Sequence, residues 1–167
     1  ICFVGPCAAK KLEASRRSVR SEVDFVLTFE ELMGLFEAKQ VNFAELPDNP
    51  EDAFHSASAD ARGFATSGGV AQAVVNAIKK MDPDREVKVA SAQGLAECKK
   101  LMTMAKAGKY NGYLLEGMAC PGGCIAGAGT LADPAKSIAM LNKYKAEAEM
   151  KVATETPFQD SLELLHY

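Results

Sequence analysis

Residues 112–124 read GYLLEGMACPGGC, an apolar run that leads directly into two cysteines separated by proline and glycine. The apolar run is typical of a β-strand, and the turn-forming residues after it mark the end of that strand. Residues 1–7, ICFVGPC, show the same order, and a helical pattern follows them. Both cysteine segments are therefore predicted to lie at the carboxyl ends of strands, on the one edge where an open parallel sheet binds its ligands.

The rest of the chain alternates β-type runs with helical patterns. Two more β-type runs lie at residues 23–27 and 86–90, and three apolar stripes with a helical period lie between the runs. This alternation predicts a single α/β domain over residues 1–167, with a mostly parallel sheet flanked by helices. The three stripes are Phe29, Leu32, Met33 and Phe36; Val70, Val74 and Ile78; and Leu95, Cys98, Leu101, Met102 and Ala105.

Local signals predict where several helices begin and end. Thr28 is predicted to cap the first of these helices with Glu31 closing a capping box, and Gly108 is predicted to end the third. A further helix is predicted near residues 134–150, where Lys, Glu and Ala dominate. Residues 42–62 show no clear period and are predicted to form a long surface connection.

The composition excludes several classes of function. With 48% apolar and 25% charged residues, the 167-residue chain has the balance of a globular protein. A net charge of -3 and a pI near 5.5 argue against a nucleic-acid surface. No apolar run approaches the ~20 residues that span a bilayer, and we expect a cytoplasmic location. Because the sequence starts at Ile1, inside an apolar run, we expect it to be a fragment of a longer chain.

Five cysteines, an odd number, favour metal binding over disulfides in a cytosolic chain. Cys7 lies near the start of a predicted helix, where backbone N–H groups and the nearby Lys10 and Lys11 favour the thiolate that binds metals. Between Cys120 and Cys124, glycines allow the backbone to wrap closely around a bulky cofactor. Three thiolates suit an iron-sulfur or other soft-metal site. The alternative is a structural zinc module, although no fourth ligand lies nearby in the sequence.

Two of these segments resemble motifs of a known family. Residues 6–13, PCAAKKLE, resemble the hydrogenase pattern Met-Pro-Cys-x-x-Lys-x-x-Glu, and residues 116–124 resemble the highly specific pattern Glu-x-Met-x-Cys-x-x-Gly-Cys. The chain is therefore similar to the iron-only (FeFe) hydrogenases over roughly residues 1–130. Three further segments that resemble this family, in the family's order, are residues 26–32, 66–70 and 87–90.

The resemblance implies that the chain is the C-terminal part of the hydrogenase H-cluster domain, one half of that domain. It implies that Cys7, Cys120 and Cys124 are three of the four ligands of a 4Fe-4S cubane, and that Cys124 also bridges to a two-iron subcluster. We expect these three cysteines to line one open cleft. The family motif Thr-Ser-Cys-Cys-Pro, which supplies the fourth ligand and a proton-donating cysteine, is absent from the sequence.

Three more side chains receive roles from the resemblance. Lys10 would hydrogen-bond a cyanide ligand and point toward the cleft, Met118 would pack against the two-iron subcluster, and Glu13 would orient Lys10 or its loop. Lys11 is predicted to be solvated. Met118, taken outside its motif, is more typical of a side chain that fills a core.

The function that the resemblance implies is reversible hydrogen oxidation and proton reduction by the parent protein. Its partners would be the remainder of the hydrogenase chain and a ferredoxin-like electron carrier, and the isolated fragment is expected to be inactive. Gly5 replaces the family's usual methionine, and residues 127–130, GAGT, replace its fuller Gly-Gly-Gly-Gln-Pro ending. Gly5 favours the alternative, a hydrogenase-like assembly or sensory protein that carries only a 4Fe-4S cluster.

The other candidate residues have simpler explanations. Cys2 and Cys98 are predicted to be small core residues away from the cysteine site. His55 and His166 are predicted to be solvated. The turn at residues 66–69 could bind an anion at a helix N-terminus, but capping of that helix is the preferred interpretation.

Overall fold

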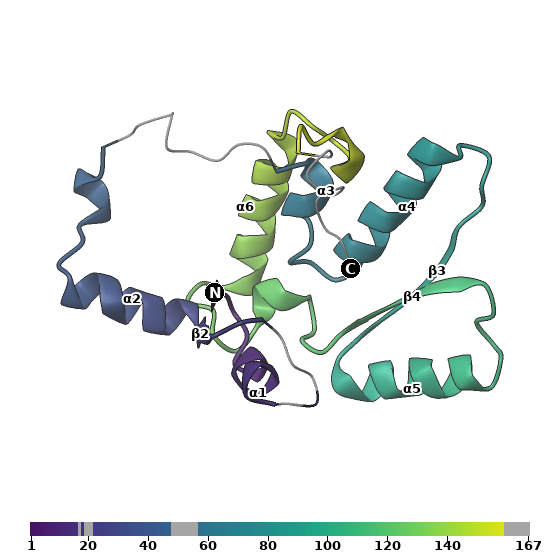
Figure 1. Ribbon diagram of the computed structural model, residues 1–167, viewed down its shortest axis with the longest axis horizontal. Helices are drawn as coiled ribbons and strands as arrows, with labels where there is room; N and C mark the ends of the chain where they lie inside the picture. Colours follow the sequence, from purple (N-terminus) through teal and green to yellow (C-terminus); the bar gives the residue numbers. More distant parts are fainter. Residues whose placement is uncertain (17, 19–21, 48–56, 159–167) are drawn as a thin grey trace.

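Among the residues that the structure describes, four short strands pair in parallel and form two separate two-stranded sheets (Figure 1). This computed structural model describes residues 1–16, 18, 22–47 and 57–158. Strand β1 pairs with β2 and sets Phe3 beside Val26. Strand β3 pairs with β4. The strands are β1 (Cys2–Val4), β2 (Phe25–Leu27), β3 (Lys88–Gln93) and β4 (Tyr113–Met118).

The predicted α/β class with parallel strands and flanking helices is confirmed, but the prediction of one shared sheet edge is wrong. Within the described residues no strand ladder joins the β1–β2 pair to the β3–β4 pair. The two cysteine segments therefore end strands of different sheets. Whatever brings these segments together must be the loops after the strands.

The helices pack on the two strand pairs and on each other. Helices α1 and α2 contact β2, whereas α4 and α5 contact the β3–β4 pair and lie on either side of it in Figure 1. Helix α3 packs on α4 and α6. The helices are α1 (Ala9–Ser15), α2 (Phe29–Ala38), α3 (Ala59–Arg62), α4 (Gly69–Met81), α5 (Leu95–Lys106) and α6 (Pro134–Ala146). The described part of the chain also contains the 3-10 turns η2 (Phe43–Glu45), η4 (Cys124–Ala126) and η5 (Ala153–Glu155).

The predicted helices are present, with two corrections. The helix expected near residues 134–150 ends at Ala146. On α4 the predicted stripe is wrong in part, because Val74 is 38% exposed. The buried residues of this helix are Ala71, Ala73 and Val75. Because residues two apart point to opposite sides of a helix, α4 is covered on more than one side.

The predicted surface connection at residues 42–62 is also wrong at its end, because the turn Ser58–Arg62 is buried. The Arg62 guanidinium lies 3.9 Å from the centre of the Tyr144 ring and donates to the Tyr144 carbonyl at 2.7 Å. These contacts hold α3 against α6. Residues 48–56 lie outside the described residues.

Buried apolar residues are few and mostly small. Large apolar side chains lie at the surface instead: Phe25 of β2 is 69% exposed and Leu95 of α5 is 75% exposed. Exposed apolar surface of this kind is typical of a contact with further protein. The buried apolar residues are Ala59, Ala71, Ala73, Val75, Leu101 and Ala148.

The predicted capping box at α2 is confirmed. The Thr28 hydroxyl accepts from the Glu31 N–H at 3.3 Å, and the Glu31 carboxylate accepts from the Thr28 N–H at 2.8 Å. Thr28→Ala is therefore expected to lower the free energy of unfolding by about 1 kcal/mol. Chemical denaturation measures this change. Thr103→Ala is the control, because the Thr103 hydroxyl bonds a carbonyl inside α5 and caps nothing, and an effect equal to that of Thr28→Ala would contradict the assignment.

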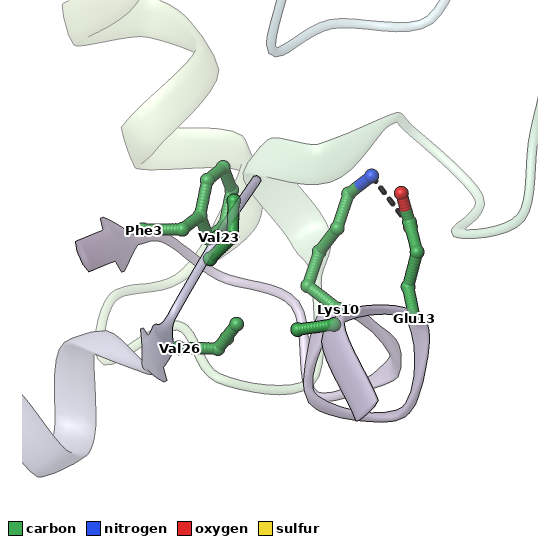
Figure 2. A pocket seen from close by; sticks show the side chains of 6 residues that line it. Phe3, Lys10, Glu13, Val23 and Val26 are labelled. Carbon is green, nitrogen blue, oxygen red and sulfur yellow. Dashed lines mark hydrogen bonds and ion pairs between the residues drawn. The ribbon is translucent and has the colours of Figure 1, made fainter. Parts of the chain in front are cut away.

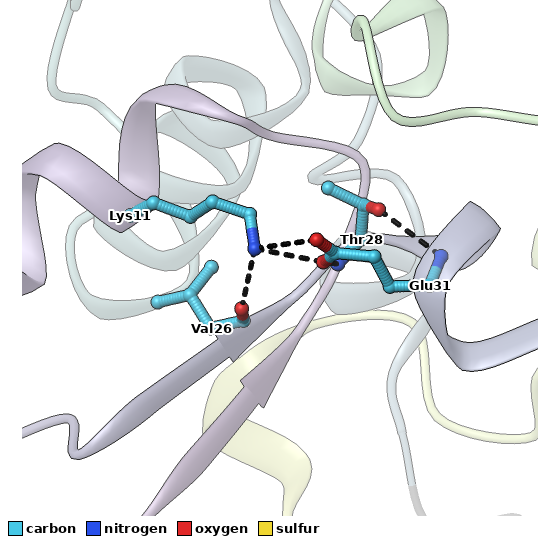
Figure 3. A network of polar contacts seen from close by, with 4 residues as sticks. All are labelled: Lys11, Val26, Thr28 and Glu31. Atoms are coloured by element: carbon cyan, nitrogen blue, oxygen red, sulfur yellow. Dashed lines mark hydrogen bonds and ion pairs between the residues drawn. The ribbon is translucent and has the colours of Figure 1, made fainter. Parts of the chain in front are cut away.

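Lys11 is exposed to solvent, as predicted, but it also makes specific contacts. Its ammonium donates to both Glu31 carboxylate oxygens, at 2.9 and 2.7 Å, and to the Val26 carbonyl at 3.0 Å (Figure 3). The hydrogen bond from Lys11 is the largest cause that lowers the pKa of Glu31 below its ordinary value. Lys11 thus ties α1 to the end of β2 and the start of α2.

None of the helices in the described part of the chain has the length and apolar character that crossing a bilayer requires.

Candidate metal centre

Both cysteine segments follow the ends of strands, as predicted. Strand β1 ends at Val4, and Cys7 lies in the loop before α1. Strand β4 ends at Met118, and the loop after it carries Cys120 and then Cys124, the first residue of η4. We call residues 119–129 the cysteine loop.

The cysteine loop packs against the loop that carries Cys7. The Gly129 N–H donates to the Pro6 carbonyl at 3.1 Å. At Gly127, a Cβ atom would lie 2.2 Å from the same carbonyl oxygen, so only glycine allows this approach. These backbone contacts bring Cys124 next to the β1 end, although β1 and β4 belong to different sheets.

The other side of the cysteine loop packs against the turn before α4. The Ser67 N–H donates to the Gly122 carbonyl at 3.1 Å, and the Ile125 N–H donates to the Ala65 carbonyl at 2.9 Å. Gly123 has φ +99°, and a Cβ atom there would lie 2.5 Å from the Ala65 oxygen. The cysteine loop is thus held between two other segments of the chain.

The three predicted ligand cysteines lie close enough to interact electrostatically. Partial desolvation is the largest cause that raises the pKa of the Cys124 thiol, and the charges of Cys7 and then Cys120 raise it further. The charge of Lys10 acts in the opposite direction and lowers it. Cys7 and Cys120 are half-buried and Cys124 is exposed. The fold therefore gathers three thiols and one ammonium from segments more than a hundred residues apart.

Lys10 and Glu13 form an ion pair on α1. The Lys10 ammonium donates to the Glu13 carboxylate at 2.7 Å, and Figure 2 shows the two side-chain tips facing each other. Phe3 and Val26 line the same small cavity, of about 70 Å³. Glu13 therefore contacts Lys10 directly, and the roles that the resemblance gives this pair at a cluster stay predictions.

An apolar cavity of about 530 Å³ adjoins the site and is lined by Pro6, Cys124 and side chains of α2 and α6. Cys124 is the one predicted ligand among the described residues that line this cavity. The expected single cleft lined by all three cysteines is thus supported for Cys124 alone. Met118 is half-buried, and its contact with a cofactor stays a prediction.

Two cysteines lie apart from this group. Cys2 is exposed on β1, so the prediction that it is a core residue is wrong. This three-residue strand leaves its end residues open to solvent. Cys98 is half-buried, and its thiol lies 3.6 Å from the carbonyl oxygens of Ala92 and Met118, which places it between α5 and the β3–β4 pair. His55 and His166 lie outside the described residues.

The donor set of the candidate site consists of thiols. Thiolates are the donors that iron-sulfur clusters and other soft metals take. Across the described ranges, no three His, Cys, Asp or Glu side chains gather closely enough to hold one metal ion. The glycines of the cysteine loop serve its packing, because a Cβ atom at Gly123 would lie 2.5 Å from the Ala65 oxygen and one at Gly127 would lie 2.2 Å from the Pro6 oxygen.

Sequence reasoning assigned no role to two side chains that hold the cysteine loop, although one of them, Glu116, is the first residue of the motif at residues 116–124. The Gln93 amide oxygen accepts from the Gly122 N–H at 2.6 Å. Glu116, 8% exposed, accepts from the backbone N–H groups of Gly68 and, at 3.0 Å, Ala71. A charged residue inside the apolar run of β4 is the signal that could have revealed Glu116. The turn at residues 66–69 does receive an anion, and that anion is a carboxylate of the chain itself.

Known proteins match both the sequence and this arrangement. A sequence profile of the family described as iron only hydrogenase large subunit, C-terminal domain, matches residues 1–128. The chain belongs to this family. The family assignment confirms the resemblance that the two cysteine motifs indicated.

Individual relatives agree with the family assignment. The periplasmic Fe hydrogenase large subunit of Nitratidesulfovibrio vulgaris is 32% identical over 74% of this chain and 37% of its own length. The mouse cytosolic iron-sulfur assembly component 3 is 30% identical over 92% of this chain and 40% of its own length. The chain therefore spans well under half the length of these curated relatives.

Solved structures show the same fold. A variant of an FeFe-hydrogenase from Chlamydomonas reinhardtii superimposes with a TM-score of 0.65 at 23% identity, covering 99% of this chain and 58% of that one. The hydrogenase fold class is thus established for this chain.

Proposed function

We propose that this chain is the C-terminal part of an iron-only hydrogenase H-cluster domain and supplies cysteine ligands to a 4Fe-4S cluster. The observation that carries the proposal is that the cysteine loop, with Cys120 and Cys124, packs on the loop of Cys7 through the Gly129 N–H, which donates to the Pro6 carbonyl at 3.1 Å. The charges of Cys7 and Cys120 both raise the pKa of the Cys124 thiol, which supports this arrangement. When bound, the cofactor supplies the electron transfer and hydrogen chemistry. The chain's own part is to bind and position that cofactor.

Each element of the site has a task under this proposal. Cys7, Cys120 and Cys124 bind the cubane, and the remainder of the parent protein supplies the fourth ligand. Lys10, held by Glu13 at 2.7 Å, places a positive charge near Cys124, where it favours bound anionic groups. The exposed apolar side chains described above support a contact with that remainder, and a ferredoxin-like carrier and a cytoplasmic location stay predictions.

The parent protein is expected to catalyse reversible hydrogen oxidation. The test is hydrogen uptake by the whole parent protein, matured with its complete cofactor, with a viologen dye as electron acceptor. Sustained uptake is expected. A parent protein that carries the cubane and takes up no hydrogen would contradict the enzymatic function.

A second candidate is a hydrogenase-like iron-sulfur assembly or sensory protein that carries only the cubane. Gly5 favours it, because the ring of Phe3 occupies the space where a larger side chain would extend: a Cβ at Gly5 would lie 2.7 Å from that ring. The similarity to the mouse iron-sulfur assembly component also supports it. The uptake assay on the parent protein distinguishes the two functions.

The chain by itself is expected to show no hydrogen uptake, even after anaerobic reconstitution with iron and sulfide. It brings together three of the four thiolates that a cubane takes, and the cysteine that would donate protons in the family motif is absent from its sequence. Dye reduction under hydrogen measures this directly. Sustained reduction of the dye above a protein-free control would contradict the proposal that the rest of the parent protein supplies part of the active site.

A further inference from the structure

Glu116 is a buried charged residue in a strand. Its side chain is 8% exposed, and along β4 it shares the more buried face with Leu114 and Met118. A buried carboxylate is costly unless hydrogen bonds satisfy it. Here both oxygens are satisfied by backbone: one accepts from the Gly68 N–H, and the other accepts from the Ala71 N–H at 3.0 Å.

These two donors belong to the first turn of α4, which lacks a cap of its own. The N-cap residue is Gly68, in the left-handed conformation with φ +86°, and no side chain of the turn caps the helix. Unpaired N–H groups and the helix dipole favour a negative charge at this position. Glu116, 45 to 48 residues away in the sequence, therefore takes the place of a local N-cap.

The same turn also holds the cysteine loop. Beyond Glu116, the Gly122 carbonyl accepts from Ser67 at 3.1 Å, and the Ile125 N–H donates to Ala65 at 2.9 Å. Residues 65–71 thus form hydrogen bonds with residue 116 before Cys120, with residue 122 between the two cysteines, and with residue 125 after Cys124. Among these contacts, only those to Glu116 involve a side chain, and that side chain is charged.

We infer that Glu116 is a positioning residue, which locks the end of β4 onto the N-terminus of α4 and so sets where Cys120 and Cys124 lie relative to Cys7. The inference rests on the proposed function, in which these cysteines bind one cluster. Glu116 does not touch the cofactor in this role. It acts through the loop that follows it.

The test compares the chain with its Glu116→Gln variant after anaerobic reconstitution with iron, sulfide and a small thiol. The amide keeps one acceptor oxygen but turns an NH2 group toward a backbone N–H, so one of the two bonds is lost. We expect Glu116→Gln to shift the electron paramagnetic resonance signal of the reduced cluster. We also expect iron release to a chelator about 10- to 100-fold faster, the size of effect that supporting residues have at metal sites.

Glu155→Gln is the matched control. The Glu155 carboxylate also accepts from two backbone N–H groups, those of Lys151 at 2.7 Å and Val152 at 3.1 Å, and it pairs with Lys80 in the last turn of α4, at the opposite end of that helix. Both backbone bonds share one carboxylate oxygen and the ion pair uses the other. Glu155→Gln therefore removes the charge partner of Lys80 but can keep the backbone bonds, and it does so far from the cysteine loop. Its cluster signal and iron release should match those of the unmodified chain.

Hydrogen exchange on the cluster-free protein gives a second readout. Glu116→Gln should speed exchange of the Ile125 and Ser67 amides, whereas Glu155→Gln should not.

If Glu116→Gln does not fold, Glu116→Asp takes its place, because aspartate keeps the charge but its shorter side chain moves the carboxylate away from the Gly68 N–H. A Glu116 variant with unchanged signal, iron release and exchange would overturn the inference, as would an equal effect of Glu155→Gln. An unmodified chain that takes up no cluster would count against the proposed function, and the exchange rates would still decide the role of Glu116.

Discussion

Replacing any one of Cys7, Cys120 and Cys124 with serine is expected to abolish cluster binding by the reconstituted chain. Each thiolate would bind a different iron, so the loss of one leaves an incomplete set of protein ligands. We expect iron and acid-labile sulfide per chain to fall at least about tenfold, because a direct ligand matters more than the supporting residues whose loss costs 10- to 100-fold. Iron and sulfide analysis with visible absorption measures the loss.

Cys7→Ser is the most informative of the three variants. A site built only from the Cys120–Cys124 pair would tolerate it, whereas a site shared between the two strand-end loops would not. Cys98→Ser and Cys2→Ser are the controls, because Cys98 lies between α5 and its sheet and Cys2 is exposed on β1. Full cluster content in Cys7→Ser, or its loss in both controls, would contradict the ligand assignment.

Gly127→Ala is expected to separate the cysteine loop from the loop that carries Cys7. The residue has φ -67°, which any amino acid can adopt, so the effect comes from contact alone. The new methyl group would lie 2.2 Å from the Pro6 carbonyl oxygen, and the backbone would have to shift. We expect the free energy of unfolding to fall by about 1–3 kcal/mol, the typical cost of overpacking. Cluster content should fall with it.

Gly34→Ala is the matched control for this substitution. Gly34 lies inside α2, and a Cβ atom there would meet nothing within 4 Å. Alanine in a helix is favoured over glycine by about 0.5–1 kcal/mol, so this variant should be slightly more stable. Denaturant unfolding and reconstitution of both variants provide the comparison. A Gly127→Ala variant as stable and as well loaded as the unmodified chain would contradict the packing of the two loops.

Features with a local cause could be predicted from the sequence. The Thr28 and Glu31 capping box depends on residues three apart, and the strands before Cys7 and Cys120 depend on short apolar runs. The cysteines proposed as ligands also stand out, because glycine and proline lie beside them in the sequence. Each of these signals lies within a few residues of the feature it predicts.

Features that depend on distant contacts could not be predicted in the same way. The two sheets were expected to be one, because apolar runs reveal strands but not which strands pair. The approach of Gly127 to Pro6 joins residues far apart in the chain, and so does the bond from Glu116 to Gly68. Burial was misjudged for Cys2 for the same reason, since an apolar run does not say whether another element covers it.

The central claim is that Cys7, Cys120 and Cys124 together bind one 4Fe-4S cluster. Mössbauer spectroscopy of the chain reconstituted anaerobically with iron-57 tests it most directly, because the spectrum distinguishes mononuclear iron, two-iron clusters and cubanes. The account predicts one cubane per chain, with one iron distinct from the others because its fourth ligand is an added thiol. A spectrum of mononuclear iron held by thiolates, or of iron not bound at cysteine, would contradict it.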